Sequence, residues 1–185
     1  MSILFASDIH GSAHYCRKLL DAFCSLGAER LVLLGDILYH GPRNDLPAEY
    51  SPKEVISLLN PLKNKIYAVR GNCDTEVDQM VLDFPILSDY ALLSFSGKTF
   101  YATHGHVFHP GCLPPIQAGD ILIYGHTHLW QAERMEAEGI GTITVINPGS
   151  VSIPKGGNPP TFGLLQGKTF QIRTFEQEII KEIEP

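Results

Sequence analysis

Short apolar runs separated by two helical patterns are the feature that most constrains the fold of this chain. Each run is long enough for one buried strand and ends at a glycine or a polar residue: residues 2–7, 30–34 and 65–69. Ser12 is a suitable N-cap for a helix that ends at Gly27, and Ser51–Glu54 predicts a capping box at the start of a second helix. The order strand, helix, strand, helix, strand is typical of a parallel sheet covered by helices.

The second half of the chain contains strand patterns without helical patterns between them. They cover residues 90–95, 98–103, 120–124, 130–136, 142–146, 161–165 and 169–174. Gly97 predicts a hairpin between the first two, and segment 147–160 is rich in glycine and proline and too polar for a core. We therefore expect an α/β fold in which two mixed β-sheets pack face to face with helices outside, as one domain over residues 1–185.

Composition excludes several classes of protein. The net charge is -6 and lysine and arginine form no run, which argues against an extended nucleic-acid groove or an anionic membrane surface. No signal peptide is recognisable, and no stretch approaches the ~20 apolar residues of a spanning helix. The four cysteines form no CxxC pair, and Cys16 and Cys24 are expected as small core residues of the first helix. Reduced cytoplasm is the expected compartment.

Residue types that bind metals follow five of the predicted strands directly. They are Asp8, His10, Asp36, Asn72, His104, His126 and His128. Functional groups gather beyond the carboxyl ends of strands in open α/β sheets, so these five motifs should meet in one site. A single Asp-x-His or Gly-Asp is more often a turn or a cap. Turns and caps do not explain why six of the eight histidines lie in or near the five motifs.

The residue types suit a pair of divalent metal ions. Imidazoles with carboxylates and an amide favour manganese, iron or zinc over calcium or magnesium. Two ions held about 3.5–4 Å apart can clamp a phosphoryl group and activate a bridging water. If seven side chains share two ions, one carboxylate must bridge, and Asp36, alone on its turn, is the natural candidate. His126 and His128 are separated by one residue and could therefore serve different ions.

The ordered motifs resemble those of the calcineurin-like metallophosphoesterase superfamily. They are Asp8-Ile9-His10, Gly35-Asp36, Gly71-Asn72-Cys73-Asp74, Thr103-His104-Gly105-His106 and Gly125-His126-Thr127-His128. Segments 70–74 (RGNCD), 147–152 (NPGSVS) and 154–159 (PKGGNP) are similar to the small YfcE-type phosphodiesterases within it. The resemblance implies a four-layer αββα sandwich. It also implies hydrolysis of small phosphodiesters by a metal-bridging hydroxide, with two divalent ions, manganese first and nickel, iron or zinc as alternatives.

The resemblance also implies how the ligands divide between the two ions. One ion would take Asp8, His10, Asp36 and His128, and the other Asp36, Asn72, His104 and His126. Asp36, Asn72 and His104 would act in catalysis. Two divalent ions against two carboxylates leave such a site about two charges positive, so an acidic protein could still bind an anionic substrate.

Four further residues are candidates for substrate contact. Cys73 stands where the phosphatase branches of the superfamily carry a histidine that, with the following aspartate, protonates the leaving group; a small filler on the loop is the alternative. His106 could contact substrate oxygens or only support a ligand. Arg43, like Arg70, could bind phosphate oxygens or form a surface salt bridge. Ser150 is expected to donate a hydrogen bond from the wall of the pocket.

Two other functions remain open for this fold. The first is a protein-interaction scaffold similar to a retromer subunit, which keeps residual metal binding after losing ligands. This chain retains every ligand of the pattern. The second is a nuclease similar to the repair nucleases, for which the basic groove is absent. We expect a small phosphodiester as substrate and no membrane partner, while the oligomeric state, including a homo-oligomer, stays open.

Overall fold

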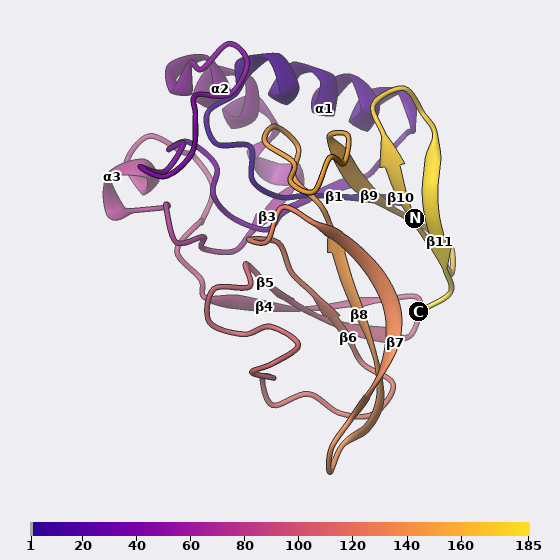
Figure 1. Ribbon diagram of the computed structural model, residues 1–185. Helices are drawn as coiled ribbons and strands as arrows, with labels where there is room; N and C mark the ends of the chain where they lie inside the picture. Colours follow the sequence, from indigo (N-terminus) through magenta and orange to yellow (C-terminus); the bar gives the residue numbers. More distant parts are fainter. Residues whose placement is uncertain (1) are drawn as a thin grey trace.

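Two β-sheets packed face to face form the centre of the protein, and helices cover the outer side of one of them (Figure 1). The computed structural model describes residues 2–185. The larger sheet has the order β11-β10-β9-β1-β2-β3. Its strands are β1 (Ser2–Ala6), β2 (Arg30–Leu33), β3 (Ile66–Ala68), β9 (Thr161–Gln166), β10 (Thr169–Thr174) and β11 (Ile179–Ile183). β1, β2 and β3 are parallel, and β9 is antiparallel to β1.

The smaller sheet has the order β4-β5-β6-β8-β7. Its strands are β4 (Tyr90–Phe95), β5 (Lys98–Thr103), β6 (Ile121–Ile123), β7 (Trp130–Ala137) and β8 (Gly141–Pro148). β5, β6 and β8 run parallel, while β4 and β7 are antiparallel edge strands. The predicted hairpin turns at Ser96 and Gly97, whose φ values are 51° and 76°. The prediction of two mixed sheets in an α/β fold is confirmed.

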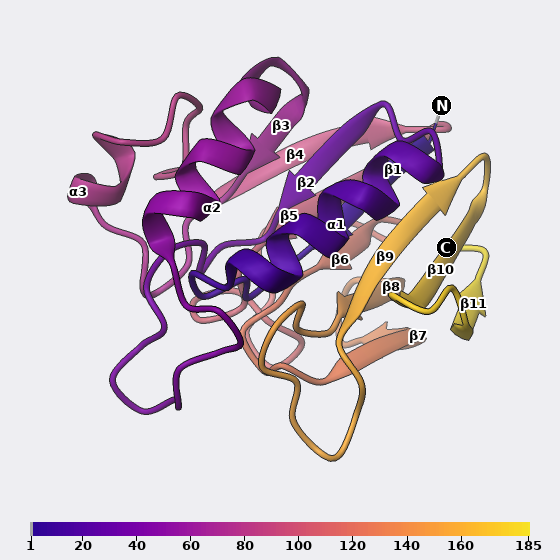
Figure 2. The same cartoon turned by 90° about the horizontal axis from the view of Figure 1, so that it is seen from above.

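Helices α1 (Ala13–Ser25) and α2 (Pro52–Leu59) lie on the outer face of the larger sheet (Figure 2). A 3-10 helix (Asn60–Lys65) follows α2 directly, and the short α3 (Glu76–Gln79) lies to one side, apart from α1 and α2. Ser12 caps α1 as predicted, accepting a hydrogen bond from the Tyr15 amide. α2 begins at Pro52, but the predicted capping box is wrong. At φ −149° and ψ 79°, Ser51 lies outside the usual extended cap geometry and its side chain makes no cap hydrogen bond.

Alternation along the strands builds a core on each side of the larger sheet. Leu4 packs with α1 and α2, whereas its neighbour Phe5 points to the smaller sheet. Phe5 stacks on Phe100 of β5 with ring centroids 5.9 Å apart. Burying a side chain of this size contributes about 1.5–3 kcal/mol. These contacts fix the two sheets relative to each other and thereby align their strand ends.

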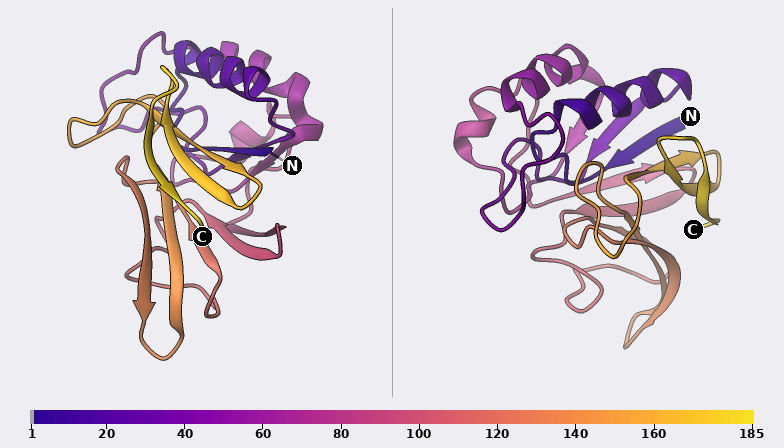
Figure 3. Two further views of the ribbon diagram at one scale, coloured as in Figure 1. Left: turned by 90° about the vertical axis from the view of Figure 1, so that its right-hand side faces the viewer. Right: turned by 45° about the horizontal axis from the view of Figure 1, so that its top comes forward.

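The outer face of the smaller sheet is covered by segment 104–120, in which the structure contains no helix. Ile116 of this segment is buried against Leu122 and Val145 of the sheet. Both the beginning of β1 and the end of β11 lie on one side of the molecule (Figure 3). Within residues 2–185 no helix is long and apolar enough to cross a bilayer.

Two expectations about burial are wrong. Cys24 lies on the exposed face of α1, whereas Cys16 is buried as expected, because α1 turns one stripe to the core and the other to solvent. Segment 147–160 is not a surface loop throughout. Asn147 and Ser150 are fully buried, because they hydrogen-bond to backbone groups of neighbouring loops.

Candidate metal centre

Loops that leave the strand ends bring the seven predicted ligands to one edge of the two sheets. The Nε2 atoms of His10 and His128 lie 3.4 Å apart although the residues are 118 positions apart in the chain. His104 Nε2 lies 3.2 Å from Asn72 Oδ1, and the His104 and His126 rings are 5.1 Å apart. The convergence expected from the strand-end pattern is present in the structure.

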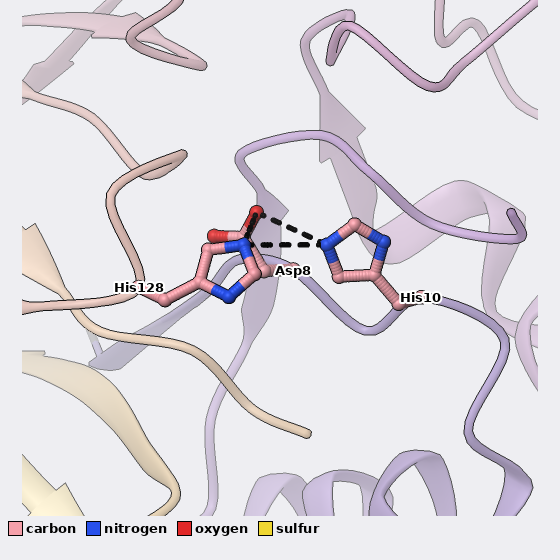
Figure 4. Close-up of side chains that lie close together, drawn as sticks. All are labelled: Asp8, His10 and His128. Carbon is pink, nitrogen blue, oxygen red and sulfur yellow. Dashed lines mark hydrogen bonds and ion pairs between the residues drawn. The ribbon is translucent and has the colours of Figure 1, made fainter. Parts of the chain in front are cut away.

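Asp8, His10 and His128 form a compact group (Figure 4). Asp8 Oδ1 lies 3.2 Å from His128 Nε2 and 3.6 Å from His10 Nε2. All three side chains are buried, and Asp8 Oδ1 has no hydrogen-bond partner among the described residues. A buried carboxylate oxygen without a donor is costly. It faces two imidazole nitrogens, so these residues fit a divalent cation at this point.

Asp36 lies between this group and a second one. Its Oδ2 is 3.6 Å from His10 Nε2 and 3.5 Å from His104 Nε2, while its Oδ1 accepts a hydrogen bond from the Cys73 amide. Asp8, Asp36 and His104 also bring one donor atom each within 4.8 Å of the others. One carboxylate thus faces imidazoles from both sheets.

Backbone carbonyl groups orient three of the imidazoles. The Nδ1 atoms of His10, His104 and His128 lie 2.7, 2.6 and 2.7 Å from the carbonyls of Tyr39, Leu34 and Ile153. A carbonyl can only accept, so each Nδ1 carries a hydrogen, and each Nε2 is the ring nitrogen left to face the site. This support is typical of histidines that bind metals. No carbonyl partner is found for the His126 ring within residues 2–185.

The ligand loops adopt an unusual backbone conformation. Five ligands have a left-handed φ between 49° and 66°: Asp8, His10, Asp36, His126 and His128. The first loops are also bonded to each other, because the His10 and Gly11 amides donate to the carbonyls of Asp36 and Ile37. Strained non-glycine residues cluster at functional sites, where the surrounding structure holds them in place.

Asp74 ties two of these loops together. Its carboxylate is buried and accepts hydrogen bonds from the amides of Asp36, Ile37 and Gly71 at 2.7–2.9 Å. Both oxygens are therefore used by the backbone. Asp74 therefore joins the loop after β2 to the loop after β3.

A cavity of about 450 Å³ opens directly onto the ligands. Its lining includes His10, Asp36, Asn72, His126 and His128, with Cys73 and Arg43 among the expected substrate contacts. Ser150 does not line it: the side chain is fully buried and its hydroxyl donates to the Asp8 carbonyl. We therefore assign Ser150 a positioning role in place of the expected substrate contact. His106 faces an adjacent cavity of about 480 Å³ that also reaches His126.

Sequence reasoning missed two features of this cavity. Lys155 lies on its wall but was only part of a matching segment. The carbonyls of Leu34, Tyr39 and Ile153 hold the imidazoles, and a backbone group leaves no signal in a sequence. The glycine of the Gly-Asp motif, in contrast, is a clear signal in the sequence. A Cβ on Gly35 would lie 2.5 Å from the Gly71 amide nitrogen, so only glycine lets the two loops meet.

The charges of the site perturb its own ionisation. Burial lowers the pKa of His104, but the pairing with Asp36 outweighs it and raises that pKa to about 9. Burial raises the pKa of Asp8, yet the facing His10 and His128 hold it well below its usual range. Burial and the nearby Asp36 raise the pKa of the Cys73 thiol, which therefore stays protonated. The site without metal retains protons that a cation would displace.

Two face-to-face mixed sheets with clustered aspartates and histidines at their strand ends define a metallophosphoesterase. The family model described as calcineurin-like phosphoesterase superfamily domain matches residues 1–169, and the chain belongs to this superfamily.

The chain is similar over its whole length to phosphodiesterase YfcE of Escherichia coli K12. The two are 47% identical over 184 residues, which are 99% of this chain and 97% of the relative. A solved structure of YfcE, a phosphoesterase from E. coli, superposes with a TM-score of 0.94 at 46% identity, covering 100% and 99% of the two chains. Phosphodiesterase MJ0936 of Methanocaldococcus jannaschii is 29% identical over 94% of this chain and 97% of its own.

Proposed function

We propose that the protein is a metal-dependent phosphodiesterase that hydrolyses small phosphodiesters at a centre of two divalent ions. The observation that carries the proposal is the position of Asp36, whose Oδ2 lies 3.5–3.6 Å from imidazole nitrogens of both ligand groups. Superfamily membership and the full-length similarity to phosphodiesterase YfcE support it.

We assign the ligands to two positions. The first metal position comprises Asp8, His10, Asp36 and His128, and the second comprises Asp36, Asn72, His104 and His126. Bound ions would supply Lewis-acid stabilisation of the phosphoryl oxygens and an activated water at neutral pH. Manganese is our first choice because the donors are imidazole, carboxylate and amide groups, with nickel, iron and zinc as alternatives.

The remaining residues of the cavity set the limits of the reaction. Cys73 Sγ lies within 4.8 Å of donor atoms of His10 and Asp36, but its raised pKa makes the thiol a poor acid. We therefore expect little proton donation to the leaving group and a steep dependence of rate on leaving-group pKa. His106 is half-buried and lines the adjacent cavity, where its ring can contact a second ester substituent.

The alternatives fit less well. A scaffold that keeps this fold after losing its chemistry has no need of imidazoles whose tautomers are fixed by buried carbonyls. A cavity of about 450 Å³ is suited to a small molecule rather than to a polymer. We also propose a reducing compartment such as the cytoplasm, since the four cysteines are free thiols.

The test is turnover of matched aryl phosphodiesters and monoesters after chelation and after addition of manganese, nickel, zinc or magnesium. We expect no activity without metal, restoration by manganese, and preference for diesters with acidic leaving groups. Metal-independent turnover, or a preference for monoesters with poor leaving groups, would contradict the proposal. Elemental analysis of the restored enzyme should give two ions per chain.

A further inference from the structure

Two cationic side chains line the metal cavity without an acidic partner. Arg43 comes from the segment between β2 and α2, and Lys155 comes from the segment between β8 and β9. Within residues 2–185 neither side chain forms an ion pair or a hydrogen bond. Both side chains are exposed to solvent, whereas four other cations of the chain, Arg17, Lys18, Lys63 and Arg70, pair with carboxylates.

The backbone around Lys155 is fixed by contacts that begin at a metal ligand. The Lys155 amide donates to the carbonyl of His128. The Lys155 carbonyl accepts from both the amide and the side chain of Asn158, at 3.2 and 2.9 Å, and Asn158 accepts in turn from the Trp130 indole. Gly156, at φ 67°, makes the turn that follows. The loop therefore holds the base of an unpaired lysine beside the metal centre.

The charge balance of the cavity indicates which kind of group Lys155 binds. Two divalent ions less the carboxylates of Asp8 and Asp36 leave about two positive charges, and a phosphodiester brings one negative charge. Asp36 is the one acidic residue on the cavity wall and is already counted. Arg43 and Lys155 add two more positive charges, which a singly charged diester leaves without a partner.

We propose that Lys155, with Arg43, forms a subsite for a second anionic group, a phosphate or a carboxylate carried by one arm of the phosphodiester. This inference rests on the proposed function and narrows its substrates to diesters with an additional negative charge. A lysine ammonium suits such a group as a point charge, and the arginine fork can bind two of its oxygens.

The test compares two esters that share a leaving group. They are thymidine 5′-(p-nitrophenyl phosphate) and the same compound with a 3′-phosphate. We expect the manganese-loaded protein to favour the 3′-phosphorylated ester in kcat/KM by about tenfold to a hundredfold, the usual range for hydrogen bonds to charged groups. Lys155→Met should bring the ratio close to one, Arg43→Met should lower it, and Lys155→Arg should keep most of it.

The matched control is Lys168→Met, which removes one exposed lysine in the turn between β9 and β10, outside this cavity. It should leave the ratio unchanged. A ratio near one in the unmodified protein, or one that both cavity variants leave intact, would overturn the inference while the proposed function stands.

Calorimetry tests the proposed anionic subsite separately from the proposed phosphodiesterase activity. The metal-loaded protein should bind thymidine 3′,5′-bisphosphate more tightly than thymidine 5′-phosphate, and Lys155→Met should remove the difference. If neither ester is hydrolysed, the proposed function fails, and these two affinities still decide whether the subsite exists. Equal affinities in the unmodified protein would overturn it.

Discussion

The two proposed metal positions differ in how firmly the fold holds their ligands. At the first, Asp8, His10 and His128 are buried, with exposures of 0%, 1% and 4%, and both imidazoles are fixed by carbonyl groups. At the second, His104 is buried and fixed, whereas Asn72 is exposed and His126 is half-buried. Asp36 belongs to both.

This difference predicts an order of binding. Ligands that are already in place lose little conformational freedom when they bind a cation, and a buried site excludes competing water. The first position should therefore fill at lower metal concentration, while the second is completed by side chains that remain open to solvent. The exposed ligands also lie where substrate enters, so the looser position can adjust to the phosphoryl group.

Asp36 is shared by both metal positions, so its substitution should affect the two positions alike. Asp36→Asn is expected to lower kcat/KM by about a thousandfold or more and to empty both positions, because a neutral amide is a poor bridge between two cations. Elemental analysis beside kinetics is the measurement. Asp45→Asn, an exposed acid outside the cavity lining, is the control. Two retained ions with near-normal turnover would show that Asp36 does not bridge.

A substitution of Asp74 tests whether its hydrogen bonds make the loops of the metal centre rigid. Asp74→Asn keeps one acceptor oxygen but presents an amide to backbone donors, so we expect a loss of about 2–4 kcal/mol in the free energy of unfolding. Urea denaturation of the metal-free protein measures it. Asp83→Asn, whose exposed carboxylate pairs with Lys63, should stay within about 0.5 kcal/mol. Equal effects of the two substitutions would mean that the Asp74 bonds add no rigidity.

Substitution of His126 and of His128 tests the difference between the two metal positions directly. His128→Ala should weaken metal binding at the first position by at least about a hundredfold, and His126→Ala should weaken the second by at least about tenfold, because loss of an outer-shell partner alone typically costs about 10–100-fold. Anomalous scattering from crystals of each variant shows which ion is lost. Loss of the same ion in both variants contradicts the assignment.

Proton release distinguishes the metal-free state of the second position. The pKa of His104 is raised to about 9, against about 6.5 when unfolded, so its pairing with Asp36 stabilises the metal-free fold below pH 6.5. This stabilisation is lost as the pH rises through about 9. At pH 7.5 a cation must displace this proton, and calorimetry in buffers of different ionisation enthalpy should detect its release, together with any from His10, whose pKa burial lowers but the facing Asp8 raises on balance. In the metal-free protein, Asp36→Asn should lower the pKa of His104 toward its ordinary value, which an NMR titration measures, and an unchanged pKa would show that another group raises it.

The sequence predicted the convergence of these side chains because strand ends are visible in it. Apolar runs that stop at Asp8, Asp36 and His104 indicate both the strand and the residue that follows its carboxyl end. Parallel strands place Asp8 and Asp36 on one edge of the larger sheet, and the packing of the two sheets brings His104 of the smaller sheet to the same edge. The same logic missed β11, since Ile179–Ile183 is a largely exposed edge strand without clean alternation of burial.

The supporting interactions were not predictable in the same way. Any residue type can supply the carbonyls of Tyr39 and Ile153, so nothing in their side chains marks them. Ser150 looks like a donor in sequence, yet its hydroxyl is used within the fold by the Asp8 carbonyl. Asp74 matched the family pattern, but its three backbone partners depend on how two loops approach each other.

The left-handed backbone conformation of five proposed ligands has a consequence for how such a chain evolves. Each non-glycine residue in this conformation costs about 1–2 kcal/mol, and five ligands share it. The sum approaches the whole net stability of a typical domain. Selection for catalytic turnover must therefore retain these residues although their backbone strain lowers the stability of the fold. In a lineage where that selection lapses, glycine at position 126 or 128 relieves strain, so drift would erode the centre by the same substitutions that make the fold more robust.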